Sequence, residues 1–122
     1  MTIRVLVVED EIDGGDVVAG ILEHHNFVAD VVMTAEEALQ RLDASDYNAA
    51  VIDLALPGMS GFDLIQRIRN HNRCSMLPCI AYTAYHSSKV RYEAKESGFD
   101  AYLEKPLDRK LLISTLKELL DQ

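Results

Sequence analysis

Short apolar runs that each end in a polar or charged side chain are the feature that most constrains how this chain can fold. Four such runs end at Glu9-Asp10-Glu11, at Asp53, at Thr83 and, just after Leu103, near Lys105-Pro106. Near-continuous apolar runs of this length are typical of strands that are covered on both faces. The sequence therefore predicts buried strands whose last residues carry the chemistry of the protein.

Strand-like and helix-like segments alternate five times along the chain. The predicted strands are Ile3–Val8, Phe27–Val32, Asn48–Asp53, a run opened by Pro78, and Asp100–Leu103. The predicted helices are Asp16–His25, one opened by Thr34, Gly61 to about Asn70, His86–Ser97 and one capped by Asp108. This alternation predicts an α/β fold with a doubly wound, five-stranded parallel sheet and helices on both faces. Five units are too few for a closed eight-stranded barrel.

Local signals refine this prediction. Gly14-Gly15 predicts a weakened first helix or an irregular first turn, and a loosened loop beside the site. Thr34 and Glu37 form a capping-box pattern, in which the hydroxyl and the carboxylate satisfy opposed backbone donors. Asp30, inside the second strand, predicts a position near the edge of the sheet.

Composition limits the class of protein. A length of 122 residues predicts one domain that spans residues 1–122. A net charge of -8, from 20 acidic and 12 basic residues, disfavours direct binding of nucleic acid. No apolar run approaches the ~20 residues that span a bilayer, and no signal peptide precedes the first strand. Cys74 and Cys79 form neither a disulfide framework nor a zinc motif, which indicates a reduced, cytoplasmic protein.

The polar residues at the predicted strand ends define a candidate site. Ligands of doubly wound sheets bind beyond the carboxyl ends of the strands. There, Glu9, Asp10 and Asp53 would repel one another unless a cation compensates, and a few oxygen ligands favour Mg²⁺. The Asp53 carboxylate could attack phosphorus to give an acyl phosphate, with Lys105 as a second cation. Thr83 would then donate to a phosphoryl oxygen only after transfer, as a switch requires.

This set of residues resembles the receiver domain of two-component response regulators, the CheY-like family. The resemblance covers essentially the whole chain and rests on four motifs in order. They are Val7-Val8-Glu9-Asp10-Glu11, the segment from Asp53 to Gly61, Thr83-Ala84, and Tyr102-Leu103-Glu104-Lys105-Pro106. Each motif is weak alone, but all four with these gaps are highly specific. The resemblance implies a (βα)5 flavodoxin-like fold with strand order 2-1-3-4-5.

The resemblance also implies roles at the metal and phosphoryl site. Glu9 and Asp10 correspond to the acidic pair that holds Mg²⁺, Glu9 through water. Asp53 corresponds to the phosphoacceptor, and the backbone carbonyl of Ala55 to a further metal ligand. Lys105 corresponds to the phosphate-binding lysine. No free metabolite is turned over: such a domain is a signalling switch, not an enzyme, and catalyses only its own phosphorylation and dephosphorylation.

Further implied roles concern signal transmission. Thr83 corresponds to the switch hydroxyl, Tyr102 to the aromatic residue that turns inward with it, and the Lys105–Pro106 bond is expected to be cis. The implied donor is a phosphohistidine on a sensor histidine kinase or a phosphotransfer protein. The implied output is a downstream protein that reads the surface of residues 86–97, 101–103 and 110–120, with the domain a monomer or a phosphorylation-dependent dimer. No DNA-binding segment follows in this sequence, and a stand-alone receiver and a piece of a longer chain both stay open.

Other classes fit less well. A phosphatase of the haloacid-dehalogenase type would need an aspartate where Ala55 stands. A flavodoxin-like cofactor carrier would need a Ser/Thr/Gly-rich loop where the chain has Glu9-Asp10-Glu11. A degenerate receiver would lack some site residues, and none is missing. Ala55 offers no polar group to align water and Tyr85 is bulky, so we expect both to prolong the phosphorylated state.

Overall fold

The computed structural model describes residues 2–121, in which five strands alternate with five helices. The strands are β1 Arg4–Val8, β2 Val28–Val32, β3 Ala49–Asp53, β4 Cys79–Thr83 and β5 Ala101–Glu104. The helices are α1 Ile12–His24, α2 Ala35–Ala44, α3 Gly61–Arg69, α4 Ser88–Ser97 and α5 Arg109–Leu120. The predicted alternation is confirmed, with element ends within a few residues of those expected.

All strand pairs are parallel, and the sheet has the order β2-β1-β3-β4-β5. This confirms the predicted fold and order. The prediction that Asp30 lies near the sheet edge is also confirmed, because β2 is an edge strand. The switch point of this order lies between β1 and β3, and ligands of such sheets bind beyond the carboxyl ends of the strands at this point.

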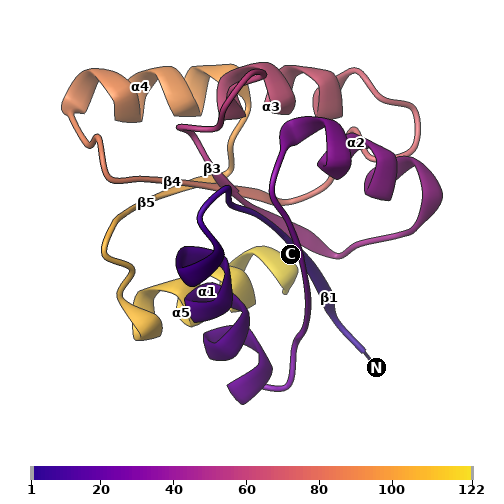
Figure 1. Ribbon diagram of the computed structural model, residues 1–122, viewed down its shortest axis with the longest axis vertical. Coiled ribbons are helices and arrows are strands. Elements are labelled where there is room, and N and C mark those ends of the chain that lie inside the picture. Colours follow the sequence, from indigo (N-terminus) through magenta and orange to yellow (C-terminus); the bar gives the residue numbers. More distant parts are fainter. Residues whose placement is uncertain (1, 122) are drawn as a thin grey trace.

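Helices cover both faces of the sheet (Figure 1). The pair α1 and α5 lies on one face, and α2, α3 and α4 lie on the other. Successive strand residues point to opposite faces, so Val5 and Val7 join the core under α1 and α5 while Leu6 and Val8 join the other core. β3 and β4 are buried along their whole length, which explains their continuous apolar sequence.

The first helix begins earlier than predicted. α1 starts at Ile12 rather than at residue 16 and includes Gly14 and Gly15 as regular helix, so the expected irregular turn and loosened loop were wrong. A Cβ on Gly14 would lie 2.8 Å from a carboxylate oxygen of Glu9, and a Cβ on Gly15 2.8 Å from a methyl group of Val31. Close packing against β1 and β2, not backbone freedom, therefore accounts for both glycines.

Side chains cap the starts of α2, α3, α4 and α5, and the caps at Thr34 and Asp108 were predicted from the sequence. Thr34, Ser60, Ser87 and Asp108 each accept a hydrogen bond from the backbone N–H three residues later. At Thr34 the expected box is only half formed, because the Glu37 carboxylate accepts from the Thr34 hydroxyl, at 3.5 Å, rather than from the backbone.

α4 is the helix least tied to the core. Its only fully buried residue is Ala94, which matches the weak apolar face of this segment in the sequence. Few buried contacts are typical of elements with low local stability. Within residues 2–121 none of the helices has the length and apolarity that crossing a bilayer requires.

Candidate functional site

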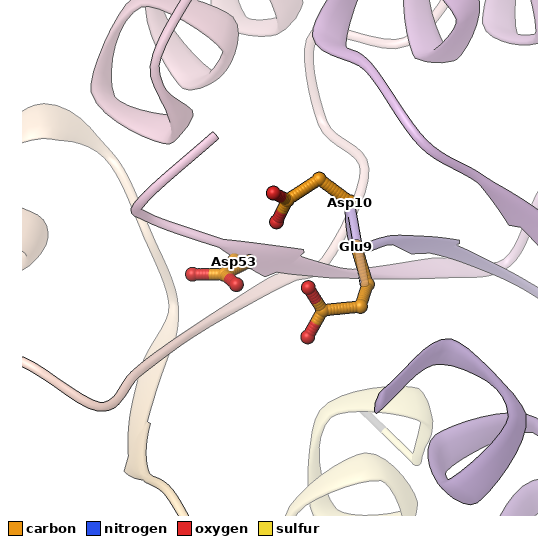
Figure 2. A group of neighbouring side chains, drawn as sticks. All are labelled: Glu9, Asp10 and Asp53. Carbon is orange, nitrogen blue, oxygen red and sulfur yellow. The ribbon is translucent and has the colours of Figure 1, made fainter. Parts of the chain in front are cut away.

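The carboxyl ends of β1 and β3 bring three carboxylates together. Glu9 and Asp10 directly follow β1, and Asp53 is the last residue of β3. One oxygen of each side chain lies within 4.8 Å of the other two. Figure 2 shows the Asp10 and Glu9 carboxylates on either side of the strand end, with Asp53 beside them. Residues separated by more than 40 positions in the sequence thus form one acidic cluster.

Asp53 is buried, and both of its oxygens have a hydrogen-bond donor. The backbone N–H of Ala55 donates to Oδ1 at 2.9 Å, and Lys105 Nζ donates to Oδ2 at 2.7 Å. Gly61 allows this loop to be tight, since a Cβ there would lie 2.6 Å from the carbonyl oxygen of Asp53. The turn after β3 is therefore held close to the carboxylate.

Glu9 is buried, as Asp53 is, and accepts three hydrogen bonds. Oε1 accepts from Lys105 Nζ at 2.8 Å and from the Tyr82 hydroxyl at 3.0 Å. Oε2 accepts from the backbone N–H of Glu11 at 3.1 Å. Lys105 therefore bridges Glu9 and Asp53 and places one cation among three carboxylates.

Burial and pairing set the protonation of these groups. Burial raises the pKa of Asp53 above its ordinary value, and the hydrogen bonds from Lys105 and Ala55 offset only part of this effect. Burial acts in the same sense on Glu9, but donors from Lys105, Glu11 and Tyr82 outweigh it and lower the pKa of Glu9. Burial would lower the pKa of Lys105, yet its two carboxylate partners raise it, so it stays charged.

The other predicted site residues lie around this cluster. Thr83 is buried at the end of β4, next to β3 in the sheet, and its hydroxyl accepts from the backbone N–H of Tyr85 at 3.0 Å. Tyr85 itself is 74% exposed. The Lys105–Pro106 peptide bond is cis.

Tyr102, on β5, is half-buried and packs against the core under α2, α3 and α4. Its hydroxyl is 3.1 Å from His86 Nδ1, and the guanidinium of Arg91 lies 5.5 Å from the centre of its ring. His86 Nε2 in turn is 3.4 Å from a carboxylate oxygen of Glu104. Sequence reasoning singled out Tyr102 but not these partners.

A cavity of about 320 Å³ opens onto the cluster. Its lining consists of Asp10, Glu11, Asp53, Ala55, Ala84, Tyr85 and Lys105. Asp53 thus lies between the cavity and the buried charges, whereas Glu9 does not line the cavity. A larger depression of about 930 Å³ between α2 and α3 lacks this convergence of carboxylates and a lysine, so we assign the chemistry to the smaller one.

The donor set fits a hard divalent cation. Carboxylate oxygens are the ligands that Mg²⁺ prefers, and Mg²⁺ keeps several waters when it is bound by few side chains. Asp10 and Asp53 border the cavity and could contact the ion directly, while the recessed Glu9 suits an outer position. Because the cluster holds three carboxylates and one lysine, a bound cation would neutralise the remaining negative charge.

Sequence reasoning missed Tyr82. It was counted as part of the apolar run before Thr83, yet its hydroxyl lies in the acidic cluster. Burial raises the pKa of Tyr82 far above the ordinary range, so the hydroxyl keeps its proton and donates. A tyrosine inside a strand buried on both faces was an available signal, because a buried tyrosine hydroxyl usually finds a partner.

Comparison with known proteins defines the class. Residues 5–117 match the response regulator receiver domain family. An uncharacterized 14.6 kDa protein of Leptolyngbya boryana is 39% identical over 93% of this chain and 87% of its own length. The two-component response regulator PhoP of Pseudomonas aeruginosa is 37% identical, and the match covers 96% of this chain and 51% of PhoP.

Solved structures agree with this class. A CheY-like response regulator receiver domain protein from Methanospirillum hungatei superimposes with a TM-score of 0.91 at 29% identity, covering 99% of this chain and 95% of that one. The match to the family model, together with the doubly wound fold and its acidic strand edge, identifies a receiver-type signalling domain. This chain belongs to the response regulator receiver domain family, whose general function is a phosphorylation-activated switch. The chain spans about half the length of PhoP.

Proposed function

We propose that Asp53 is the phosphoacceptor of this domain and that Glu9, Asp10 and the backbone carbonyl of Ala55 complete a Mg²⁺ site with it. The observation that carries the proposal is the position of the Asp53 carboxylate. It borders the open cavity, lies 2.7 Å from Lys105 and shares a 4.8 Å cluster with two further carboxylates. A phosphoryl donor can reach only an acceptor that lines the cavity, and Asp53 lines it whereas Glu9 does not.

The transfer forms one bond and breaks one. A carboxylate oxygen of Asp53 attacks phosphorus, the bond from phosphorus to the donor nitrogen breaks, and the electron pair leaves with the imidazole of the donor. Lys105 stays beside Asp53 and pairs with a phosphoryl oxygen, and the N–H of Ala55 orients the carboxylate. Bound Mg²⁺ would supply charge compensation for the developing negative charge on the phosphoryl oxygens.

Signal transmission would follow from new hydrogen bonds. The Thr83 hydroxyl would donate to a phosphoryl oxygen, and Tyr102 would turn inward from its contacts with His86 and Arg91. The changed surface would be that of α4, β5 and α5. The shallow anchoring of α4 supports this choice, since a loosely packed helix moves at low cost in free energy.

The partners follow from the family. Receiver domains work with histidine kinases and with downstream proteins, and we propose a phosphohistidine of a sensor kinase or phosphotransfer protein as the donor here. We further propose that the phosphorylated state is long-lived. Ala55 lacks a side chain that could align water, and Tyr85 lines the mouth of the cavity.

Intact mass spectrometry tests the acceptor. The chain is incubated with phosphoramidate and Mg²⁺ and compared with Asp53→Asn and Asp30→Asn, a control aspartate on the edge strand. We expect one phosphoryl group on wild type and on Asp30→Asn, none on Asp53→Asn, and none on wild type when EDTA replaces Mg²⁺. Equal gain by Asp53→Asn would contradict the assignment. A phosphorylated state that decays within seconds of donor removal would contradict the proposed roles of Ala55 and Tyr85.

A further inference from the structure

Tyr82 contacts two charged groups of the site from behind. It is 1% exposed and packs in the core under α1 and α5. Its hydroxyl donates to Glu9 Oε1 at 3.0 Å, and Lys105 Nζ lies 4.7 Å from the centre of its ring. No role in phosphoryl transfer has so far been given to this side chain, although it is the largest of the fully buried ones.

Glu9 occupies a space that α1 leaves open. The nearest backbone of α1 carries no side chain at Gly14, where a Cβ would lie 2.8 Å from Glu9 Oε1 and 3.1 Å from its carboxyl carbon. Glu9 Oε1 therefore lies close both to the Tyr82 hydroxyl and to the backbone of α1 at Gly14. In this position it stays out of the cavity that Asp10 and Asp53 border.

The hydrogen bonds of Glu9 must change when Lys105 acts on a phosphoryl group. In the structure Lys105 Nζ is shared between Glu9 Oε1 and Asp53 Oδ2. If Lys105 shifts toward the phosphoryl oxygens, Glu9, with a fully buried side chain, loses the one cationic hydrogen-bond donor that it has among the residues that this structure describes. A buried carboxylate without compensation is strongly unfavourable. The hydroxyl of Tyr82 and the N–H of Glu11 are the donors that remain.

We propose that Tyr82 is a positioning residue of the phosphoryl site: its hydroxyl holds Glu9 against α1, so that Lys105 is free to pair with the phosphoryl group on Asp53 and leaves the carboxylates open to the bound cation. Without the hydroxyl, Glu9 depends on Lys105, which then stays between Glu9 and Asp53 and competes with the metal. This inference rests on the proposed function and adds a residue to it.

Tyr82→Phe removes the hydroxyl and keeps the ring over which Lys105 lies. Tyr47→Phe is the matched control, because the Tyr47 hydroxyl also donates to a carboxylate, that of Asp30, at 2.8 Å. Isothermal titration calorimetry with MgCl₂ measures the Kd for Mg²⁺. We expect Tyr82→Phe to raise this Kd about tenfold, at the lower end for loss of a hydrogen bond to a charged group, and Tyr47→Phe to leave it within about twofold of wild type.

A second pair of variants moves Glu9 without changing Tyr82. Gly14→Ala crowds the Glu9 carboxylate, whereas Gly20→Ala, on the same helix, meets nothing within 4 Å. Both gain the same helix propensity. We expect Gly14→Ala to weaken Mg²⁺ binding several-fold and Gly20→Ala to leave it unchanged. If Tyr82→Phe does not fold, an unchanged Kd in Gly14→Ala shows that the position of Glu9 does not govern Mg²⁺ binding, and the inference is then wrong.

The outcomes separate the two proposals. If wild type binds Mg²⁺ and is phosphorylated on Asp53, but Tyr82→Phe and Tyr47→Phe give the same Kd, Tyr82 is only a core residue and the inference is wrong. A loss of thermal stability in Tyr82→Phe with an unchanged Kd leads to the same conclusion. If wild type binds no Mg²⁺ at millimolar concentration, the proposed function fails, and the inference fails with it.

Discussion

Two clusters of this molecule combine the same three groups: a tyrosine hydroxyl, a basic side chain and a carboxylate. In the cluster on the edge strand β2, which we call the edge triad, Arg4 Nη2 and the Tyr47 hydroxyl both donate to Asp30 Oδ2 at 2.8 Å. The guanidinium also lies over the Tyr47 ring, 4.8 Å from its centre. The cation thus contacts the ring of the tyrosine with which it shares the carboxylate.

The site triad, formed by Lys105, Glu9 and Tyr82, repeats this geometry at the carboxyl edge of the sheet. Lysine and tyrosine both donate to one carboxylate oxygen, at 2.8 and 3.0 Å, and Nζ lies 4.7 Å from the ring centre. The two triads differ in their neighbours, because Glu9 of the site triad also lies in the acidic cluster with Asp10 and Asp53.

Charge balance and burial distinguish the two triads. In the edge triad one cation meets one carboxylate, and their side chains are 39% and 27% exposed. In the site triad Lys105 is 21% exposed and Glu9 is fully buried, with more carboxylates than the lysine can neutralise. The edge triad is complete as it stands, whereas the site triad leaves negative charge for a bound cation. The following predictions use this difference.

The largest expected effect is that of removing the ammonium group of Lys105. Lys105→Met leaves Glu9 and Asp53 without a positive partner and is expected to lower the free energy of unfolding by about 3 kcal/mol in EDTA, as for breaking a buried ion pair. Arg4→Met in the exposed edge triad should lose much less. Urea unfolding measures both. Equal losses would show that burial does not distinguish the triads.

Mg²⁺ should stabilise the folded chain by binding at the site triad and not at the edge triad. At a free concentration of about 100 times its Kd, Mg²⁺ is expected to add roughly 2.7 kcal/mol to the free energy of unfolding. Asp30→Asn should keep this gain, and Asp53→Asn should lose most of it. Thermal unfolding with and without MgCl₂ gives the comparison, and a gain that survives in Asp53→Asn would argue for a different metal site.

Without metal, the two aspartates should respond with opposite sign to neutralisation. Because burial raises the pKa of Asp53, its charge is unfavourable in the folded state, and Asp53→Asn is expected to stabilise the chain by on the order of 1 kcal/mol. Hydrogen bonds from Tyr47 and Arg4 lower the pKa of Asp30, so Asp30→Asn should destabilise. Unfolding in EDTA near neutral pH tests the sign, and destabilisation by both substitutions would contradict it.

The smallest effect concerns pH. Asp30, with a pKa below its ordinary 3.8, contributes stability above that pH and loses it as the pH falls through the lower folded pKa. Asp53, with a pKa above 3.8, carries a penalty that begins to shrink as the pH falls through its raised folded pKa and is gone below 3.8. On acidification, the free energy of unfolding of wild type should therefore fall relative to that of Asp30→Asn. It should rise relative to that of Asp53→Asn. Urea unfolding without metal, repeated down to about pH 3, measures this pH dependence. The same dependence on pH in wild type and both variants would contradict the prediction.

The sequence predicted the parts of the molecule that depend on local pattern. Apolar runs gave the strands, and their ends located Glu9, Asp10 and Asp53 at one edge because parallel strands share a direction. The edge position of Asp30 followed from a charge inside an apolar run. These features depend on periodicity and on the geometry of parallel sheets, both of which can be read along the chain.

Contacts between distant side chains could not be predicted in the same way. Tyr82 and Glu9 are 73 residues apart, and nothing in the run around Tyr82 identifies its partner. Gly14-Gly15 looked like a helix breaker, since propensity is local, whereas their real constraint is the approach of Glu9 and Val31. The pairing of His86 with Tyr102 also depends on how the segment before α4 lies against β5.

The proposed acceptor is tested most directly by locating the phosphoryl group within the chain. After incubation with phosphoramidate and Mg²⁺, borohydride reduces an acyl phosphate of aspartate to homoserine, which tandem mass spectrometry assigns to one residue. We predict homoserine at position 53 in wild type, absent when EDTA replaces Mg²⁺. Homoserine at Asp10 or at another carboxylate, with Asp53 unchanged, would contradict the assignment of the acceptor to the end of β3.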